Sequence, residues 1–427
     1  MRGNQLTIVF NVFLAFISVI LPAFLTYVAL ASNTTSNTIA LSCGVVAFCL
    51  MATNLFLATR PPIIERIMGG LDQVYFAHKW IGISTLVLVI AHKAIGMNLD
   101  GTILTRETAS LAKEVAEFVF PILIVLLSIS FIKRIPKLPF EIPYQFWRMG
   151  HRLLGIVFMA LVFHQFFVRA PIEANSLLSN YLQLAAVIGV FSFLYTQLGA
   201  IFRRRKYQIS FIEKHPAATI IEAKPKGSFK IKSHPGNFAF LSIARKGLRE
   251  PHPFTISQAR EDGTIQFSIR GLGDFTKYMR DNVQAGDAAT IEGGYGRFDY
   301  RRDTNQQIWV GGGIGITPFL AFCDSIQNDN QRKIHLYYCV GKAEEAVGLK
   351  RIEAAAERSK NFSYTLYVSA NEGRFSAKHI VENSPIDISS SSLWFCGPGP
   401  MREAIVVDLK KAGKSPKGVH YEKFEFR

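Results

Sequence analysis

The sequence predicts a membrane bundle of six helices, followed by a small antiparallel β-barrel and a doubly wound α/β domain. Residues 1–202 consist mostly of apolar runs, whereas residues 203–427 alternate short apolar strands with turns and helices. The chain is 49% hydrophobic and yet carries a formal net charge of +16. These two properties indicate that the apolar residues and most of the charged residues lie in different parts of the sequence. Because 427 residues exceed one ordinary domain, we place the domains at 1–202, 203–304 and 305–427.

Six apolar stretches are long enough to cross a bilayer, whose hydrocarbon core is about 30 Å thick. They cover residues 6–31, 39–58, 74–97, 115–132, 150–169 and 180–202. The first contains Pro22 and ends in Ala29-Leu30-Ala31, which resembles a signal-peptidase site. We expect a retained span, because this apolar run is longer than the core of a signal peptide, which is usually about 7–15 residues.

Basic residues gather in alternate loops between these stretches, while the intervening loops are neutral or mixed. The basic positions are Arg60, Arg66, Lys133, Arg134, Lys137, Arg148, Arg152 and residues 203–206. This distribution predicts a multi-pass protein of the cell membrane with both termini in the cytoplasm. It also explains the positive charge without nucleic acid, for which no recognition motif is present. The five cysteines form no CxxC and no metal-ligand spacing.

Four histidines lie inside the apolar stretches: His78 and His92 are 14 positions apart, and His151 and His164 are 13 apart. A histidine in a membrane span is costly and usually functional, although a single one is often only packed or hydrogen-bonded. Two spans with a histidine near either end can hold two haems, about 20 Å apart along each helix, because neutral imidazole is a standard axial ligand. We expect His78 to pair with His151 near the cytoplasmic side, and His92 with His164 near the outer side.

The second spacing raises a geometric question. Thirteen residues of ideal helix place His151 and His164 about 140° apart around the axis. Either that helix deforms or the two haem planes differ in azimuth. Arg148 and Arg152 flank His151 and could pair with haem propionates or simply set the topology, and Lys93 is a further candidate for the outer propionates or for substrate.

After the basic segment 203–206 the pattern changes to short strands, at 207–213, 218–224, 238–245, 264–269 and 288–292. Pro, Gly and Asn punctuate them, as in a small antiparallel barrel. Three motifs lie among them: His252-Pro253-Phe254-Thr255, the segment 270–276 (RGLGDFT) and the segment 293–296 (GGYG). Each motif alone is also ordinary turn chemistry.

Further strands at 308–310, 334–341, 362–369 and 392–396 alternate with helices at 343–358 and 399–412, which predicts a doubly wound sheet. The first of these strands leads into the glycine-rich segment 311–319 (GGGIGITPF). Glycines between a strand and a helix let the backbone approach a pyrophosphate, although Ile316 replaces the last glycine of a strict GxGxxG. Phe395-Cys396-Gly397-Pro398 ends another strand, at the edge where such sheets bind ligands.

Together these residues resemble the ferric reductase/NADPH oxidase superfamily in its compact bacterial form. The resemblance covers nearly the whole chain and rests on the two histidine spacings and on HPFT, IRxxGDxT, GGGIGITPF and CGP in this order. It implies two b-type haems, FAD and a nicotinamide cofactor. The implied haem ligands are His78, His92, His151 and His164. The implied flavin residues are His252, Pro253, Phe254 and Thr255, with Arg270, Gly273 and Thr276 at the FAD pyrophosphate. The implied nicotinamide-cofactor residues are Gly311, Gly312, Gly313, Gly315, Thr317, Cys396 and Gly397.

The resemblance also implies a C-terminal aromatic residue that covers the flavin and yields to the nicotinamide. Phe424 matches best, although Phe426 is an alternative. Phe424 would act with Thr255 and Cys396 at the site of hydride transfer. We favour NADPH over NADH, because Lys342 and Arg374 could meet a 2′-phosphate and no acidic ribose ligand is evident at the end of the second strand.

The implied function is that of a transmembrane oxidoreductase. Electrons would pass from cytoplasmic NAD(P)H through FAD and two haems to an acceptor on the outer side, either oxygen giving superoxide or ferric iron. The alternative is a membrane module that delivers electrons to a periplasmic or surface redox protein, because fold and family do not choose the acceptor. A different class of function, a six-span channel or transporter with a nucleotide-sensing domain, would involve no haem.

Overall fold

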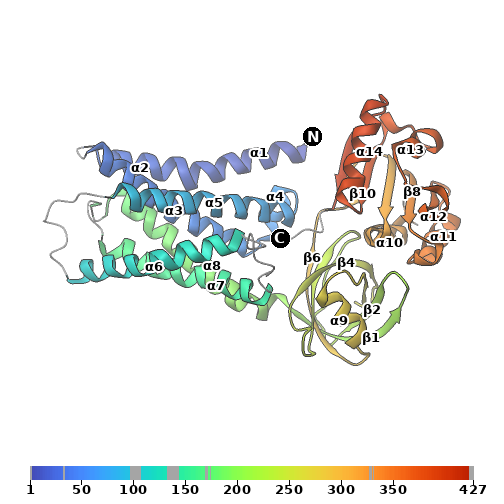
Figure 1. Ribbon diagram of the computed structural model, residues 1–427, viewed down its shortest axis with the longest axis horizontal. Helices are drawn as coiled ribbons and strands as arrows, with labels where there is room; N and C mark the ends of the chain where they lie inside the picture. Colours follow the sequence, from blue (N-terminus) through green and yellow to red (C-terminus); the bar gives the residue numbers. More distant parts are fainter. Residues whose placement is uncertain are drawn as a thin grey trace. The chain divides into compact units, whose positions relative to one another are not determined.

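The computed structural model describes residues 2–31, 34–96, 107–131, 144–168, 172–173, 175–326, 329 and 331–422. The chain divides into two compact units, Met1–Phe202 and Arg203–Arg427. The first unit is helical, and the second contains two β-sheets with short helices (Figure 1).

The helices of the first unit are α1 (Arg2–Ala15), a π-helical turn η1 (Phe16–Ile20), α2 (Leu21–Ala29), α3 (Thr35–Ala58), α4 (Pro62–Met68), α5 (Leu71–Ile95), α6 (Glu107–Phe131), α7 (Tyr144–Val168) and α8 (Leu177–Arg203). Within the described residues, 6 helical stretches are long and apolar enough to span a membrane, which supports the predicted multi-pass protein. The prediction placed the start of several spans too late: α6 begins at Glu107, not near 115. Its first turns carry charged residues that a hydropathy pattern excludes but a helix accepts.

Pro22 does not end the first helical stretch. A proline lacks the N–H that would bond one turn back, and its ring clashes with the carbonyl there. The turn before it widens into the π-helical segment Phe16–Ile20, and the helix continues through α2. This agrees with the common use of π-turns as local adjustments within α-helices.

The haem-candidate helices α5 and α7 each pack along one main neighbour. α3 lies against α5, and α6 lies against α7. Large apolar side chains such as Phe118 and Leu184 remain exposed on the helices, as expected for surfaces that contact lipid rather than water. Two helix pairs therefore form the framework around the four histidines.

The second unit begins with a closed antiparallel barrel, as predicted. Its strand order is β1-β2-β5-β4-β3-β6. The strands are β1 (Arg205–Lys214), β2 (Thr219–Pro225), β3 (Phe238–Ile243), β4 (His252–Ala259), β5 (Ile265–Ile269) and β6 (Ala288–Tyr295), and α9 (Asp274–Asn282) follows β5. The prediction missed β4, since Pro253 cannot donate a ladder hydrogen bond and made the segment look like a turn. The barrel core contains the fully buried side chains of Tyr207, Ile221 and Phe267.

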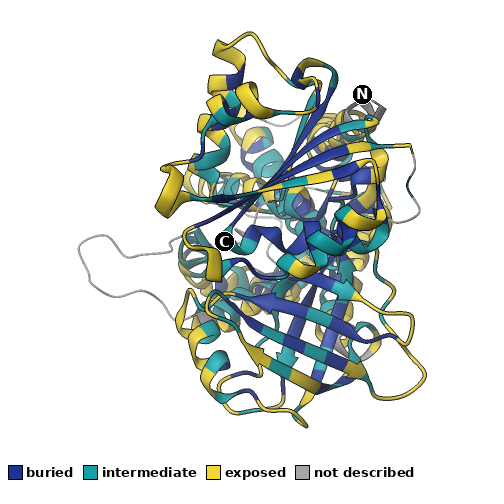
Figure 2. Cartoon of the chain, turned by 90° about the vertical axis from the view of Figure 1, so that its right-hand side faces the viewer, coloured by how far each residue is buried: buried dark blue, intermediate teal, exposed yellow. Residues whose placement is uncertain are grey.

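A parallel five-stranded sheet completes the unit, with the order β11-β10-β7-β8-β9. The strands are β7 (Gln306–Gly312), β8 (Lys333–Val340), β9 (Phe362–Val368), β10 (Ser392–Cys396) and β11 (Gly418–Tyr421). The helices of the unit not yet named are η2 (Tyr300–Arg302), η3 (Gly313–Ile316), α10 (Thr317–Ser325), η5 (Ala343–Glu345), α11 (Leu349–Arg358), α12 (Ser369–Glu372), α13 (Ala377–Asn383), η6 (Ile388–Ser390) and α14 (Gly399–Lys411). The helix predicted at 343–358 begins only at Leu349, because Gly348 has a left-handed φ of 70°. The inner strands β7, β8 and β10 are mostly buried, whereas the edge strands β9 and β11 are mostly intermediate or exposed (Figure 2).

The strand order reverses between β7 and β10. From β7 the chain continues through β8 to β9 on one side, and then returns to place β10 on the other side of β7. In doubly wound sheets ligands bind outside the carboxyl ends of the strands at this point of reversal. The glycine-rich segment follows β7 and the CGP segment follows β10, so the fold brings both predicted segments to that position.

Candidate functional site

The first histidine pair lies between α5 and α7. The ring centres of His78 and His151 are 5.8 Å apart, with an angle of 59° between the ring planes. Imidazole nitrogens ligate a metal at about 2.0–2.1 Å, so two rings on opposite sides of one metal ion stand about 6 Å apart centre to centre. The spacing therefore fits two axial ligands of one haem iron.

The second predicted pair consists of His92 and His164, which lie on the same two helices, α5 and α7. The helix α7, which carries His151 and His164, is a continuous α-helix from Tyr144 to Val168. The 13-residue spacing thus requires no break in the described helix. Of the two alternatives drawn from the sequence, haem planes that differ in azimuth stay a prediction, because they would need no break in the helix.

Each of the four histidines is hydrogen-bonded to a residue of a neighbouring helix. Nδ1 of His92 lies 2.7 Å from the Ala40 carbonyl oxygen on α3. Nδ1 of His164 lies 3.1 Å from the Ala112 carbonyl oxygen on α6. His78 bonds the main chain of Asn54. When Nδ1 donates to an oxygen, Nε2 becomes the nitrogen available to a metal, which is the usual arrangement of ligating histidines.

His151 differs from the others because a side chain accepts its hydrogen bond. Its Nδ1 is 2.9 Å from Oγ of Ser130, and that hydroxyl donates its own proton to the Leu126 carbonyl at 2.7 Å. The Ser130 oxygen is therefore free to accept from His151. Trp147 stacks on the same imidazole, with ring centres 5.2 Å apart and planes 8° apart. These contacts fix both the tautomer and the orientation of the ring.

The main-chain partners could not be found from the sequence, because every residue has a carbonyl. The structure shows that the two alanine–histidine pairs have the same spacing in the sequence. Ala40 precedes His92 by 52 residues, and Ala112 precedes His164 by the same 52. Gly44, one turn after Ala40, leaves room for the His92 ring, since a Cβ there would stand 2.8 Å from Nδ1 of His92.

Lys93 was a candidate to bind the outer haem's propionates or the substrate. Its Nζ lies 3.7 Å from the Glu117 carboxylate.

The flavin motif lies on β4 and next to the segment that follows β5. His252 stacks on Phe275 of α9, with ring centres 3.7 Å apart, so the HPFT and RGLGDFT segments are in contact. Phe254 packs edge-on against Phe267 in the barrel core. Thr255 is buried, and no side-chain or main-chain partner for its Oγ1 is found in the described part of the chain. A buried hydroxyl without a partner is costly unless a ligand satisfies it, which fits a flavin at this position.

The Arg270 side chain follows β5 in the barrel and lies near the glycine-rich segment. Its Nη1 lies 3.8 Å from the position that a Cβ on Gly313 would occupy. Beside it, the main-chain N–H groups of Leu272 and Gly273 donate to Oγ1 of Thr276. Thr276 thus shapes the turn into α9, and Arg270 remains exposed beside both predicted pyrophosphate segments. A guanidinium suits phosphate because of its charge and its parallel donors.

The glycine-rich segment and the CGP segment pack backbone against backbone. A Cβ on Gly315 would stand 2.2 Å from the Cys396 carbonyl oxygen, and one on Gly312 would stand 3.0 Å from Cδ of Pro398. Gly313 has a φ of 55°, and Thr317 donates to the Ile314 carbonyl at 3.1 Å. Only glycine permits this close approach, which leaves main-chain N–H groups at the switch point for a dinucleotide.

Cys396 is fully buried at the end of β10. Burial raises the pKa of its thiol well above the ordinary value, and the nearby Glu422 carboxylate raises that pKa further. The thiol is therefore neutral at physiological pH and can contact a nicotinamide only as an uncharged group. The sequence analysis did not identify Glu422, although it directly follows β11. Phe424 lies outside the described residues.

The structure changes one expectation about the nicotinamide cofactor. The carboxylate of Glu345 folds back to the end of β8 and accepts the N–H of Gly341 at 3.2 Å. An acidic group is therefore present where the sequence showed none, because a 3₁₀ turn returns the chain to the strand end. Lys342 and Arg374 are exposed and follow the neighbouring strands β8 and β9.

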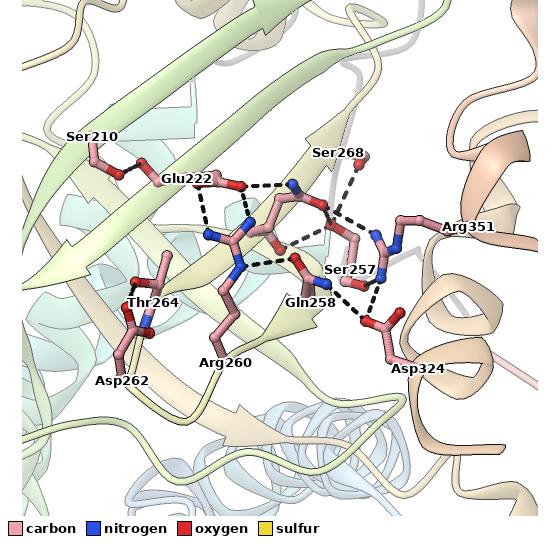
Figure 3. Close-up of polar contacts among 11 residues, drawn as sticks. Ser210, Glu222, Ser257, Gln258, Arg260, Asp262, Thr264, Ser268, Asp324 and Arg351 are labelled. Atoms are coloured by element: carbon pink, nitrogen blue, oxygen red, sulfur yellow. Dashed lines mark hydrogen bonds and ion pairs between the residues drawn. The ribbon is translucent and has the colours of Figure 1, made fainter. Parts of the chain in front are cut away.

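A polar network holds the barrel against the α/β sheet (Figure 3). Arg351 of α11 donates to the Ser257 carbonyl on β4 at 2.9 Å and to the Asp324 carboxylate of α10 at 2.6 Å. Gln258 of β4 donates to the same carboxylate at 3.0 Å. Charge-assisted hydrogen bonds are directional, so this network fixes how the barrel is oriented against the α/β sheet. Arg270 lies beside Gly313 in this orientation.

Comparison with protein families agrees with this architecture. The family described as ferric reductase like transmembrane component matches residues 43–162. An FAD-binding domain matches residues 201–308, and an oxidoreductase NAD-binding domain matches residues 309–406. The chain belongs to the ferric reductase/NADPH oxidase superfamily. It accordingly contains an FAD-binding domain followed by an oxidoreductase NAD-binding domain.

Individual relatives share only part of this architecture. The toluate 1,2-dioxygenase electron transfer component of Pseudomonas putida is 27% identical over 44% of this chain and 58% of its own length. The anthranilate 1,2-dioxygenase electron transfer component of Acinetobacter baylyi is 30% identical over 44% of this chain and 57% of its own length. The crystal structure of the Amycolatopsis cytochrome P450 reductase GcoB covers 52% of this chain and 70% of that structure, at 22% identity and a TM-score of 0.44. The chain thus spans less than two thirds of the length of the two electron transfer components.

Proposed function

We propose that the protein carries electrons across the cell membrane, from cytoplasmic NAD(P)H through FAD and two bis-histidine b-type haems to an acceptor on the outer side. The haem on His78 and His151 would receive electrons first, and the haem on His92 and His164 would pass them to oxygen or ferric iron. Both termini would lie in the cytoplasm. The alternative acceptor is a periplasmic or surface redox protein.

The observation that carries the proposal is the arrangement of the four membrane histidines. All four lie on α5 and α7, the rings of His78 and His151 are 5.8 Å apart, and a neighbouring helix forms a hydrogen bond with each ring. No group of three or more His, Cys, Asp or Glu side chains suited to a bare metal ion occurs within the described residues, whereas a haem needs only two protein ligands. When bound, the haems supply one-electron transfer and FAD supplies the exchange between hydride and single electrons.

The chain's own residues prepare these steps. The oxygens on α3 and α6 accept the Nδ1 protons of His92, His151 and His164, which leaves Nε2 of each ring available to a metal. Arg270 and the N–H groups at the glycine-rich segment offer positive charge to the two pyrophosphates. The buried, neutral Cys396 and the aromatic Phe424 would line the place of hydride transfer and exclude water from it.

The acceptor can be tested on purified protein that carries haem and FAD. The protein is reduced anaerobically with NADPH, its haem spectrum is recorded, and air or a ferric chelate is then admitted by stopped flow. Fast reoxidation by air with superoxide detected would support an oxidase, and fast reoxidation by the chelate alone would support a ferric reductase. If both are slow, the partner-protein alternative is favoured. If NADPH reduces no bis-histidine haem, the proposal is wrong.

Ser130 provides a prediction about the first haem. Replacing Ser130 by alanine removes the acceptor from Nδ1 of His151, which makes the imidazole a weaker donor to ferric iron. We expect the midpoint potential of one haem to rise while the other is unchanged, with haem affinity falling by about 10-fold or more. Spectroelectrochemical titration measures the potentials, and Ser128→Ala on the same helix is the control. Two unshifted potentials would contradict the assignment.

Cofactor preference gives a second prediction. We propose that NADPH is preferred, with Lys342 and Arg374 meeting its 2′-phosphate, while Glu345 would favour the free ribose hydroxyls of NADH. The double variant Lys342→Ala/Arg374→Ala should lose about 10-fold or more in kcat/KM for NADPH and little for NADH, since charge-assisted hydrogen bonds contribute about 1.5–3 kcal/mol each. Glu345→Gln should instead shift the ratio further towards NADPH. Equal losses for both cofactors in the double variant would refute the assignment.

A further inference from the structure

One exposed segment of the barrel has no role in the proposed electron path. Residues 224–232, which include the last two residues of β2 and part of the connection to β3, contain no acidic residue and four exposed lysines, Lys224, Lys226, Lys230 and Lys232. Phe229 lies in the middle of the segment, with 74% of its surface exposed. No other large apolar side chain in the described part of the Arg203–Arg427 unit is as exposed. Lysines around an exposed aromatic residue form a surface suited to an anionic, partly apolar partner.

Hydrogen bonds hold both sides of this segment to the start of the barrel. The N–H of Lys226 donates to the Lys206 carbonyl at 2.8 Å, and the N–H of Ile231 donates to the Tyr207 hydroxyl at 3.1 Å. Between these two anchors, the Arg205 guanidinium lies 5.4 Å from the centre of the Phe229 ring. The aromatic tip is therefore fixed beside the first residues of β1.

The first residues of β1 follow directly on a membrane-spanning helix. The apolar span within α8 ends at Gly199, and the helix itself ends at Arg203. Four residues of helix advance about 6 Å, which is comparable with the headgroup layer of about 5–7 Å on each side of a bilayer. Arg203 thus reaches the outer level of the headgroups, and Arg205, which contacts Phe229, follows two residues later. The covalent connection therefore limits how far the segment can lie from the lipid surface.

The charges near this point favour anionic lipid. Arg203 and Arg204 face the buried Glu292 carboxylate, with Nε–Oε distances of 3.3 and 3.6 Å. Their charge is therefore largely directed into the barrel. The lysines of the 224–232 segment are exposed, although Lys230 also donates to the Glu261 carbonyl at 3.3 Å. A negative membrane surface attracts such juxtamembrane cations. Aromatic side chains beside such cations are stable at the boundary between headgroups and acyl chains.

We propose that residues 224–232 are a lipid-contact segment, in which Phe229 inserts at headgroup level and the lysines bind anionic phospholipid headgroups of the bilayer that α8 crosses. The contact would hold the barrel at the membrane surface next to the end of α8. It involves no residue that we assign to haem, FAD or NAD(P)H.

Limited trypsin digestion of the full cofactor-loaded protein in nanodiscs tests this contact. One preparation contains phosphatidylcholine alone, and the other also contains phosphatidylglycerol. Mass spectrometry follows cleavage after Lys226, and cleavage after Lys414, in an exposed turn after α14, is the internal rate reference. We expect several-fold slower cleavage after Lys226 in the anionic nanodiscs, with the difference abolished by high salt. Equal cleavage in both lipids, whether fast or slow, would overturn the proposal, because mere proximity to a bilayer does not depend on its charge.

A matched pair of variants tests the aromatic tip. Phe229→Ser should lose most of the protection in anionic nanodiscs, whereas Phe211→Ser, which removes an exposed phenylalanine from β1, should keep it. Both variants leave the lysines and the tryptic sites intact. If Phe229→Ser is protected as well as the parent protein, the tip does not insert. If soluble glycerol phosphate protects the segment in neutral nanodiscs, the lysines form a phosphate site and the membrane contact is refuted.

Discussion

Replacing either His92 or His164 by alanine is expected to remove one haem and to leave the other. Each variant deprives the same iron of one of its two axial ligands, and a membrane-buried cofactor held by one imidazole is retained poorly. The pyridine haemochrome assay should therefore find about half of the parent haem content. Reduction of the remaining haem by NADPH should persist, because the proposed first haem and the reductase domains are unchanged.

Double variants distinguish the proposed pairing from any other. His92→Ala/His164→Ala removes both ligands of one haem and should keep the same single haem as either single variant. His92→Ala/His151→Ala removes one ligand from each haem and should keep none. Gln183→Ala on α8 is a control for substitution of a polar residue in a membrane helix. Unchanged haem content in both single variants would exclude haem ligation by this pair, and a haem-free His92→Ala/His164→Ala protein would exclude the pairing.

The fold could be predicted from the sequence wherever one physical signal dominated. Apolar runs longer than a bilayer core gave the six spans, and alternating short strands gave the barrel. The errors occurred where two signals competed. Charged residues in the first turns of α6 hid its start at Glu107, and Pro253 hid strand β4. A hydropathy pattern records burial in lipid, while helix and strand boundaries are determined by backbone hydrogen bonds.

The candidate site was predictable only to the level of side-chain chemistry. The four membrane histidines were evident because they are the only histidines among the first 202 residues. Their partners Ala40, Ala112 and Ser130 were not, since two act through main-chain carbonyls and the third is an ordinary serine. The Glu345 carboxylate at the end of β8 was missed for a similar reason: its position depends on a turn that returns the chain to the strand.

Replacing Gly315 by alanine is expected to abolish reduction by NAD(P)H while sparing the membrane unit. The new Cβ would stand 2.2 Å from the Cys396 carbonyl oxygen and 2.9 Å from the Gly397 nitrogen. Both are main-chain atoms at the carboxyl end of β10, so relief of the clash must separate the glycine-rich segment from the CGP segment. A misplacement of about 1 Å at a reacting centre can lower the rate about 100-fold. We expect a loss of that size in stopped-flow reduction by NADPH.

Alanine substitutions at two further glycines should have smaller effects than Gly315→Ala. A Cβ on Gly312 would stand 3.0 Å from Cδ of Pro398, whereas a Cβ on Gly399 would meet no atom within 4 Å. Gly312→Ala should therefore have a smaller effect than Gly315→Ala, and Gly399→Ala should have little. FAD content and haem reduction by dithionite should remain normal in all three, because the barrel and the membrane helices are untouched. Equal losses in all three variants would point to general instability of the α/β lobe. Normal reduction by NADPH in Gly315→Ala would show that close packing at the switch point is not required for nicotinamide binding.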